Sequence, residues 1–281
     1  MAKELQTGRP IWLVRAGRRG QREEIVLENN IAAICWKKLG DLTNVESKED
    51  LIARFEIVYP DKKMSSIMNE AGQAWRFRHE MQIGDTVVLP LKTEPSIAVG
   101  VVASGYKYTT EYGDLVTHVR GVEWIVKDMP RTWLEQDLLY SLSTDANVTR
   151  IRLHDAETRL PEAVNKYIKG LPPEKTVLSL LGEGEEEAHP IDLETVCRDQ
   201  IRTYMAHHFC GQCLQDLVAS IFEVEGYVAD TSPRGKDHGA DILMGHGILG
   251  LEEPRICVRV MASPRPVGAD AVNNLLCVVS S

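Results

Sequence analysis

Four potential metal ligands lie close together in the second half of the chain. His207, His208, Cys210 and Cys213 fall within one seven-residue segment, and imidazole and thiolate are groups that zinc prefers in proteins. They surround a break in a helical pattern at Gly211, however, and no second Cys/His pair stands at zinc-finger spacing. We therefore interpret the cysteines as partly buried structural thiols, with zinc binding as the alternative and a redox Cys-x-x-Cys pair as a weaker one.

A cluster of arginines near the start of the chain is suited to a different chemistry. Arg18 and Arg19 stand between Gly17 and Gly20, and glycine lets a ligand approach the backbone closely. The segment is either a loop that contacts phosphate or an ordinary solvated turn. The sequence leaves both interpretations open.

Net charge does not decide whether the protein binds nucleic acid. The 281 residues include 32 Lys and Arg against 41 Asp and Glu, a formal net charge of −9, which at first argues against a partner rich in phosphate. Residues 1–130 contain 18 basic and 18 acidic residues, whereas residues 131–281 contain 14 and 23. The acidity is confined to the second half, where residues 182–187 read GEGEEE and predict a solvated linker.

The composition is that of a globular protein, with 43% hydrophobic residues. No run approaches 18 consecutive apolar residues, and the first ten residues contain no apolar signal-peptide core. We therefore expect neither a membrane span nor secretion, and a cytoplasmic location. In that compartment disulfides rarely persist, so free thiols are expected for all six cysteines: Cys35, Cys197, Cys210, Cys213, Cys257 and Cys277.

The hydrophobic pattern predicts an α/β protein, α+β overall, of two domains. Short β-branched or aromatic runs predict a β-rich sheet or barrel in the first half, with amphipathic helices from Ser47 and from Ser65. The second half is helical in pattern over 192–225, with a break at Gly211, and then predicts three strands and a helix. The predicted strands are 11–14, 31–36, 86–91, 97–102, 121–126, 227–229, 240–244 and 256–260, and the last predicted helix is 267–279.

The segment from Phe209 to about the last residue resembles the catalytic domain of Mrr-type restriction endonucleases. The resemblance lies in Leu217-Val218, in Glu225-Gly226-Tyr227, in residues 232–243 (SPRGKDHGADIL) and in residues 254–258 (PRICV). These enzymes belong to the PD-(D/E)XK superfamily, so the resemblance implies a restriction-endonuclease-like α/β core. It also implies Mg²⁺-dependent hydrolysis of double-stranded DNA, in which carboxylates hold a hard cation that activates water.

Compared with that family, the chain keeps one half of the catalytic motif and changes the other. Asp241 falls on the first metal-binding Asp, and Asp237 on an acidic position before it. Arg259 and Met261 stand where the family has Gln or Glu and then Lys. Arginine has no acceptor for a cation, and methionine has neither a proton to donate nor a charge. The family also usually continues beyond the last predicted helix, so we expect a truncated core with an exposed strand edge.

The first half resembles the PUA-like, EVE-type domain that precedes Mrr-type catalytic domains. The resemblance covers Arg9 to Ser143 and lies in residues 11–17, 31–36, 75–88 and 100–108. It implies a PUA-like barrel that reads modified bases by taking a flipped base into an aromatic pocket. Trp36, which ends a strand and precedes Lys37-Lys38, is the best pocket candidate, although a single tryptophan is more often core. The expected nucleic-acid-binding residues are Arg15, Arg18, Arg19, Trp36, Arg76, Arg78 and Trp124, with Arg22 as a further phosphate contact.

These observations give three domain-level segments and three functional hypotheses. We expect a PUA-like recognition domain at 9–143, a connecting segment with the acidic linker at 144–191, and an Mrr-type domain at 192–281. The first hypothesis is a nuclease in restriction–modification and phage defence that cleaves foreign or modified double-stranded DNA with Mg²⁺, where a homodimer would cut both strands at once. The second, which we prefer, is a catalytically inactive modified-base reader and DNA binder. The third is a PUA-like RNA binder.

Overall fold

The computed structural model describes residues 4–171, 192–209, 211–231, 240–247, 252–261 and 267–279. The chain forms two compact units, Met1–Cys197 and Arg198–Ser281. The acidic run at 182–187 and Asp237 lie outside the described residues. The predicted mixed α/β class is confirmed, and we describe the two units separately.

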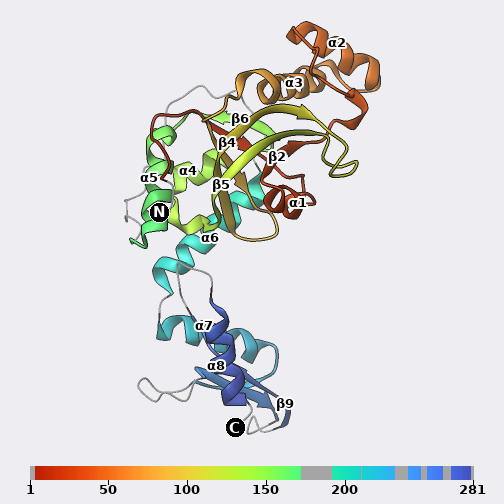
Figure 1. The fold of residues 1–281 in the computed structure, drawn as a ribbon. Helices are drawn as coiled ribbons and strands as arrows, with labels where there is room; N and C mark the ends of the chain where they lie inside the picture. Colours follow the sequence, from red (N-terminus) through yellow and green to blue (C-terminus); the bar gives the residue numbers. More distant parts are fainter. Residues whose placement is uncertain are drawn as a thin grey trace. The chain divides into compact units, whose positions relative to one another are not determined.

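The first unit is built on one six-stranded sheet (Figure 1). Its strand order is β2-β5-β4-β3-β1-β6, with β1 and β3 parallel and the other pairs antiparallel. Register shifts interrupt the long β4–β5 pair at three places, and such bulges bend a sheet. The strands are β1 (Ile11–Val14), β2 (Ile31–Ile34), β3 (Thr86–Pro90), β4 (Ser96–Tyr108), β5 (His118–Pro130) and β6 (Val148–Ile151).

Strand pairing among the described residues does not close this sheet into the barrel that we expected. The edges of the sheet are β2 and β6. Both sides of β1 are occupied, by β3 on one side and β6 on the other, so β1 has no free edge to pair with β2. The sheet therefore stays open in its hydrogen bonding, although all of its first five strands lie where the sequence predicts them.

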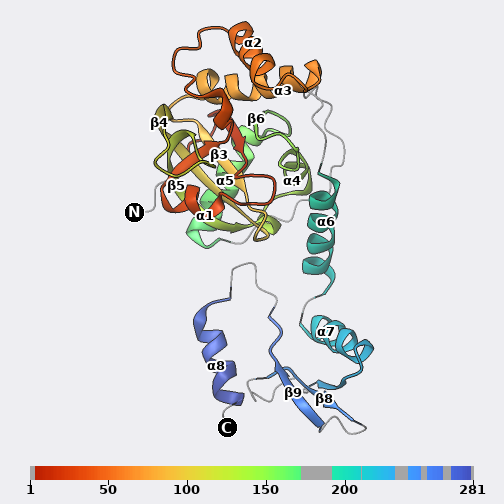
Figure 2. The ribbon, with the colours of Figure 1, turned by 90° about the vertical axis from the view of Figure 1, so that its right-hand side faces the viewer.

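Helices cover the sheet and complete the core of the first unit. Ser47 caps α2 by accepting a hydrogen bond from the backbone N–H of Asp50 (3.1 Å), as its spacing predicts. Helices α2 and α3 lie side by side in both views (Figures 1 and 2). The α-helices are α1 (Glu23–Glu28), α2 (Lys48–Val58), α3 (Met64–Trp75), α4 (Gln136–Ser141) and α5 (Ala156–Lys169), and a π-helical turn follows α3 at Arg76–Glu80.

The first unit continues beyond residue 143, where we expected a connecting segment. Strand β6 pairs with β1 along its whole length. Leu160 and Val164 of α5 are buried in one cluster with Ile11 and Leu13 of β1. We therefore propose that the recognition domain extends at least through α5.

The second unit contains a three-stranded antiparallel sheet, in the order β7-β8-β9, and the helix α7 packed on it. Ala219 and Phe222 of α7 lie in one cluster with Ile242 and Met244 of β8. The elements are α6 (Leu193–His208), which begins in the first unit, α7 (Gln212–Val224), β7 (Val228–Thr231), β8 (Ile242–His246), β9 (Glu252–Val258) and α8 (Ala269–Val279). None of the described helices combines the length and the apolar character needed to span a membrane.

Candidate nucleic-acid pocket and the motif positions of the second unit

A pocket of about 660 Å³ opens on the first unit. It lies where the end of β1, the segment after β2, helix α3 and the loops after β3 and before β6 come together. Its lining is mainly polar or charged, with one aromatic ring: Arg15, Arg18, Trp36, Ser65, Ser66, Asn69, Glu70, Gln73, Lys92, Asp145, Ala146 and Asn147. Three of the residues that the sequence predicted for nucleic-acid binding, Arg15, Arg18 and Trp36, therefore meet at one pocket.

Arg15 is fixed in place by backbone carbonyl groups. It is only 4% exposed, and its guanidinium donates to the carbonyl oxygens of Thr144 (Nε, 2.8 Å) and Leu142 (Nη2, 3.2 Å). Burial lowers the pKa of Arg15, while the nearby carboxylate of Asp192 acts in the opposite direction. Arg15 thus contributes a positive charge that cannot move and that holds the loop before β6.

Arg18 and Arg19 are exposed on a tight turn. Gly17 and Gly20 adopt φ angles of 99° and 77°, a region that glycine enters at low cost. Of the two arginines only Arg18 lines the pocket, and it has no hydrogen-bond or ion-pair partner among the described residues. Arg22, by contrast, is buried and donates to the carbonyl of Leu115, at 3.4 Å.

Trp36 belongs both to the pocket lining and to the core. It is 7% exposed, and its ring meets Phe55 edge to face, with the ring centroids 5.7 Å apart. The indole Nε1 donates to Glu70 (3.1 Å), which also accepts from the Lys62 ammonium (2.6 Å). The sequence could indicate Trp36 but not Glu70, because nothing local connects two residues so far apart in the chain.

Arg76, Arg78 and Trp124 do not line this pocket. Arg76 and Arg78 lie in the π-helical turn, where Arg78 donates to the Thr43 carbonyl (3.0 Å) and lies over the Tyr106 ring at 5.1 Å. Trp124 is partly buried between two clusters and donates to the Val26 carbonyl, at 3.3 Å. The predicted binding residues are thus divided between the pocket and two other places.

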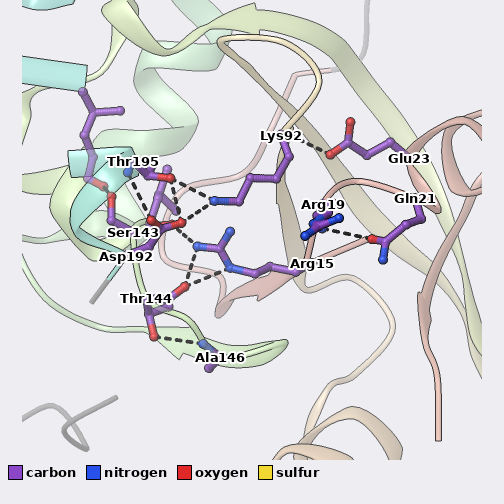
Figure 3. Close-up of polar contacts among 12 residues, drawn as sticks. Arg15, Arg19, Gln21, Glu23, Lys92, Ser143, Thr144, Ala146, Asp192 and Thr195 are labelled. Atoms are coloured by element: carbon purple, nitrogen blue, oxygen red, sulfur yellow. Dashed lines mark hydrogen bonds and ion pairs between the residues drawn. The ribbon is translucent and has the colours of Figure 1, made fainter. Parts of the chain in front are cut away.

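The structure adds to the pocket a cluster that sequence reasoning did not predict. The Lys92 ammonium donates to the Asp192 carboxylate and to the Thr195 hydroxyl (2.9 Å) (Figure 3). The Asp192 backbone N–H donates to the Ser143 carbonyl (2.9 Å), and its side chain accepts from the Thr195 N–H (3.1 Å), which caps α6. Burial alone would raise the pKa of Asp192, but the hydrogen bonds from Lys92 and Thr195 lower it to about 2.

In the second unit, the motif positions Asp241, Arg259 and Met261 lie together at one end of the β8–β9 pair. The last paired residues at this end of the two strands are Ile242 and Val258, so Asp241 and Arg259 both lie directly beyond that pair. The Asp241 N–H donates to the Val258 carbonyl (2.8 Å), and the Asp241 carboxylate accepts from the Val260 N–H (2.6 Å). Met261 follows, 45% exposed. The three motif positions are thus neighbours in the fold, and their side chains can be compared with what a metal ion requires.

These side chains do not fit Mg²⁺. A hard cation takes six or more oxygen ligands, and neither arginine nor methionine offers one. One of the Asp241 oxygens already accepts a backbone hydrogen bond. Within the part of the chain that the structure describes, no three His, Cys, Asp or Glu side chains are close enough to share a metal ion. We therefore derive no hydrolytic step for this centre.

The alternative zinc ligands are only partly described. Cys210 and the His207 side chain lie outside the described residues. Cys213 is an exposed free thiol, and the His208 ring lies 4.2 Å from that of Tyr204. The described geometry therefore does not test the zinc hypothesis.

Two family models match the chain. Residues 207–281 match a model described as restriction endonuclease, which supports the resemblance seen from Phe209 onward. Residues 12–147 match a model described as domain of unknown function (DUF8426). Neither a curated protein nor a solved structure matches the chain.

Proposed function

We propose that this protein binds double-stranded DNA, that its restriction-endonuclease-like unit does not cleave it, and that its first unit receives a modified base in the pocket lined by Trp36. DNA is the substrate of restriction endonucleases, and residues 207–281 match that family. Loss of cleavage does not require loss of the fold, because function depends on the side chains of a site and not on the fold that carries it.

The single observation that carries the proposal is that Arg259 lies at the same end of the β8–β9 pair as Asp241, directly beyond the last paired residues. Hydrolysis of a phosphodiester by this family needs a metal ion at Asp241, and the guanidinium puts a positive charge where a second ligand would stand. The same charge is well suited to a phosphate of the DNA backbone, since guanidinium and phosphate form strong hydrogen bonds. Arg259 is exposed and therefore accessible to such a partner.

The pocket of the first unit supports the reader function by its size and lining. Its volume of about 660 Å³ falls within the range of small-ligand sites, about 300–1,000 Å³. Trp36 is the aromatic residue of its lining, and Ser65, Asn69 and Gln73 of α3 add polar groups of the type that read the edge of a base. Arg18 at its rim is available for a phosphate.

Cleavage is tested by incubating methylated and unmethylated supercoiled plasmid with the protein and MgCl₂. We expect the wild-type chain to nick no more than Asp241→Ala. Mg²⁺-dependent nicking that Asp241→Ala abolishes would instead identify an active nuclease and contradict the proposal. The double variant Arg259→Gln/Met261→Lys, assayed in parallel, then shows whether these two side chains alone prevent cleavage.

Base reading is tested by fluorescence anisotropy with duplexes that carry a modified base or its plain counterpart, at one fixed salt concentration. We expect tighter binding of one modified duplex and loss of that preference in Trp36→Leu. Arg18→Gln should weaken both duplexes about equally, because a phosphate contact carries no sequence information. Equal affinity for all duplexes would refute the reader function, and displacement of the duplex by single-stranded RNA would favour RNA as the ligand.

A further inference from the structure

The start of α6 is tied to the wall of the pocket. Lys92 is both a lining residue of the pocket and the donor to Asp192 and Thr195 at the first turn of the helix (Figure 3). The Asp192 backbone N–H also donates to the Ser143 carbonyl oxygen (2.9 Å), which holds the same turn at a second point. Lys92, a lining cation that could meet a ligand anion, is therefore already occupied by a carboxylate of the chain itself.

Asp192 faces two positive charges that are largely buried. The side chains of Lys92 and Asp192 are 23% and 16% exposed, and Asp192 also interacts electrostatically with Arg15. Arg15 cannot follow a ligand outward, because the carbonyls of Leu142 and Thr144 hold its guanidinium. An anion that enters the pocket as far as these cations therefore competes with Asp192 there.

We propose that Asp192 is an internal competitor for a phosphate group, so that a phosphate-bearing ligand in the pocket displaces Asp192 from Lys92 and releases the first turn of α6. The inference rests on the proposed nucleotide-binding role of the pocket. A phosphate offers more acceptor oxygens than a carboxylate and up to twice its charge, which favours it at Lys92. The released turn is the start of a helix that runs from Leu193 to His208.

The binding test uses deoxycytidine monophosphate, with deoxycytidine and inorganic phosphate as comparison ligands, on the full chain. Asp192→Asn keeps the helix cap, because asparagine is as good an N-cap as aspartate, but it removes the competing charge. We expect this variant to bind deoxycytidine monophosphate about five- to tenfold more tightly and deoxycytidine with unchanged affinity. Asp145→Asn is the matched control. It removes a lining charge that also acts on Arg15 but is exposed, screened by solvent and not bonded to Lys92, and we expect a change below twofold.

A double-mutant comparison identifies the group for which the anions compete. If Lys92 is that group, Asp192→Asn gives no gain in affinity when Lys92→Met is already present. An equal gain in both backgrounds would mean that Asp192 weakens phosphate binding only by long-range charge repulsion and not by occupying Lys92. That result would overturn the displacement mechanism.

Amide hydrogen exchange tests the release of the helix directly. With deoxycytidine monophosphate, inorganic phosphate or a DNA duplex at saturation, we expect faster exchange at Thr195, whose N–H bonds to the Asp192 carboxylate, and at Val196, whose N–H bonds to the Asp192 backbone carbonyl. Asn147 and Val148, whose N–H groups Gln73 holds at the pocket wall (2.7 and 3.2 Å), should keep their protection.

The outcomes separate this inference from the proposed function. Duplex binding that depends on Trp36 but leaves Thr195 protected would overturn the inference and keep the proposed function. Faster exchange at Thr195 with phosphate or deoxycytidine monophosphate, in a protein that binds no duplex, would keep the inference and refute the proposed function. If none of the three ligands changes the protection of Thr195, the inference is wrong.

Discussion

Replacing Asp192 by asparagine should destabilise the first unit at neutral pH and have much less effect in acid. The change keeps the size of the side chain and the cap on α6 but removes the charge that meets Lys92. The hydrogen bonds to Asp192 lower its pKa from an ordinary value of 3.8 to about 2. A shift of that size corresponds to at most about 2.5 kcal/mol of folding free energy. Because the pair is partly exposed and screened by salt, we expect about 1–2 kcal/mol.

The pH dependence follows from the direction of the shift. A carboxyl group whose pKa is lower in the folded state stabilises the protein fully above its unfolded pKa and loses this effect as the pH falls toward the folded pKa. The contribution of Asp192 should therefore be complete above about pH 5, fall by about half at pH 3 and disappear near pH 2. The difference between wild type and Asp192→Asn should shrink over the same interval.

Tryptophan fluorescence during urea unfolding measures this unit alone, since all five tryptophans of the chain (Trp12, Trp36, Trp75, Trp124 and Trp133) lie within it. Asp114→Asn is the control, because the Lys37–Asp114 ion pair is well exposed, at 53% and 73%, and we expect little change on losing it. A difference between wild type and Asp192→Asn that is the same at pH 7 and pH 3, or absent at both, would refute the charge-based reasoning.

Two further substitutions test how the first unit is built. Gly100→Ala should destabilise it by about 1–3 kcal/mol, because a methyl group there would lie 2.6 Å from the Glu123 carbonyl oxygen. Gly105→Ala in the same strand is the control, since a methyl group there meets nothing within 4 Å and should be tolerated. Equal losses of stability in the two variants would contradict the steric explanation. Ser47→Ala should cost about 1 kcal/mol in the same urea assay by removing the cap on α2, and Ser47→Asp should retain most of the stability.

The strands that the sequence predicted share a strong local signal. Val87, Val88 and Leu89 of β3, for example, form a continuous apolar run, and all three are buried. Such runs predict buried strands whatever their partners are. Their order in the sheet was not predictable in the same way, because β1 pairs in parallel with β3, more than 70 residues further along the chain.

The helices α1, α4 and α5 and the strand β6 of the first unit were not predicted, and β6 and α5 were missed for different reasons. Strand β6 is only four residues long, and its central Thr149 and Arg150 interrupt the apolar pattern. Helix α5 contains Pro161, which argues against a helix, yet Leu160, Val164 and Ile168 repeat every four residues and could have revealed it. The Lys92–Asp192 pair could not be predicted from any local pattern, since 100 residues separate its members.

The side chains around Asp241 have a consequence for stability as well as for chemistry. Carboxylates gathered for a metal ion repel one another until the ion binds, so a nuclease that keeps them is stabilised by Mg²⁺. Here Arg259 lies at the same end of the β8–β9 pair as Asp241, and the described residues contain no group of three potential metal ligands. We therefore expect 10 mM MgCl₂ to leave amide exchange in β8 and β9 unchanged, where a metal site with a dissociation constant near 1 mM would add about 1.4 kcal/mol of protection. Mg²⁺-dependent protection at Ile242 or Val258 that Asp241→Ala removes would show that this site binds metal. The argument that the protein does not cleave DNA would then lose its basis.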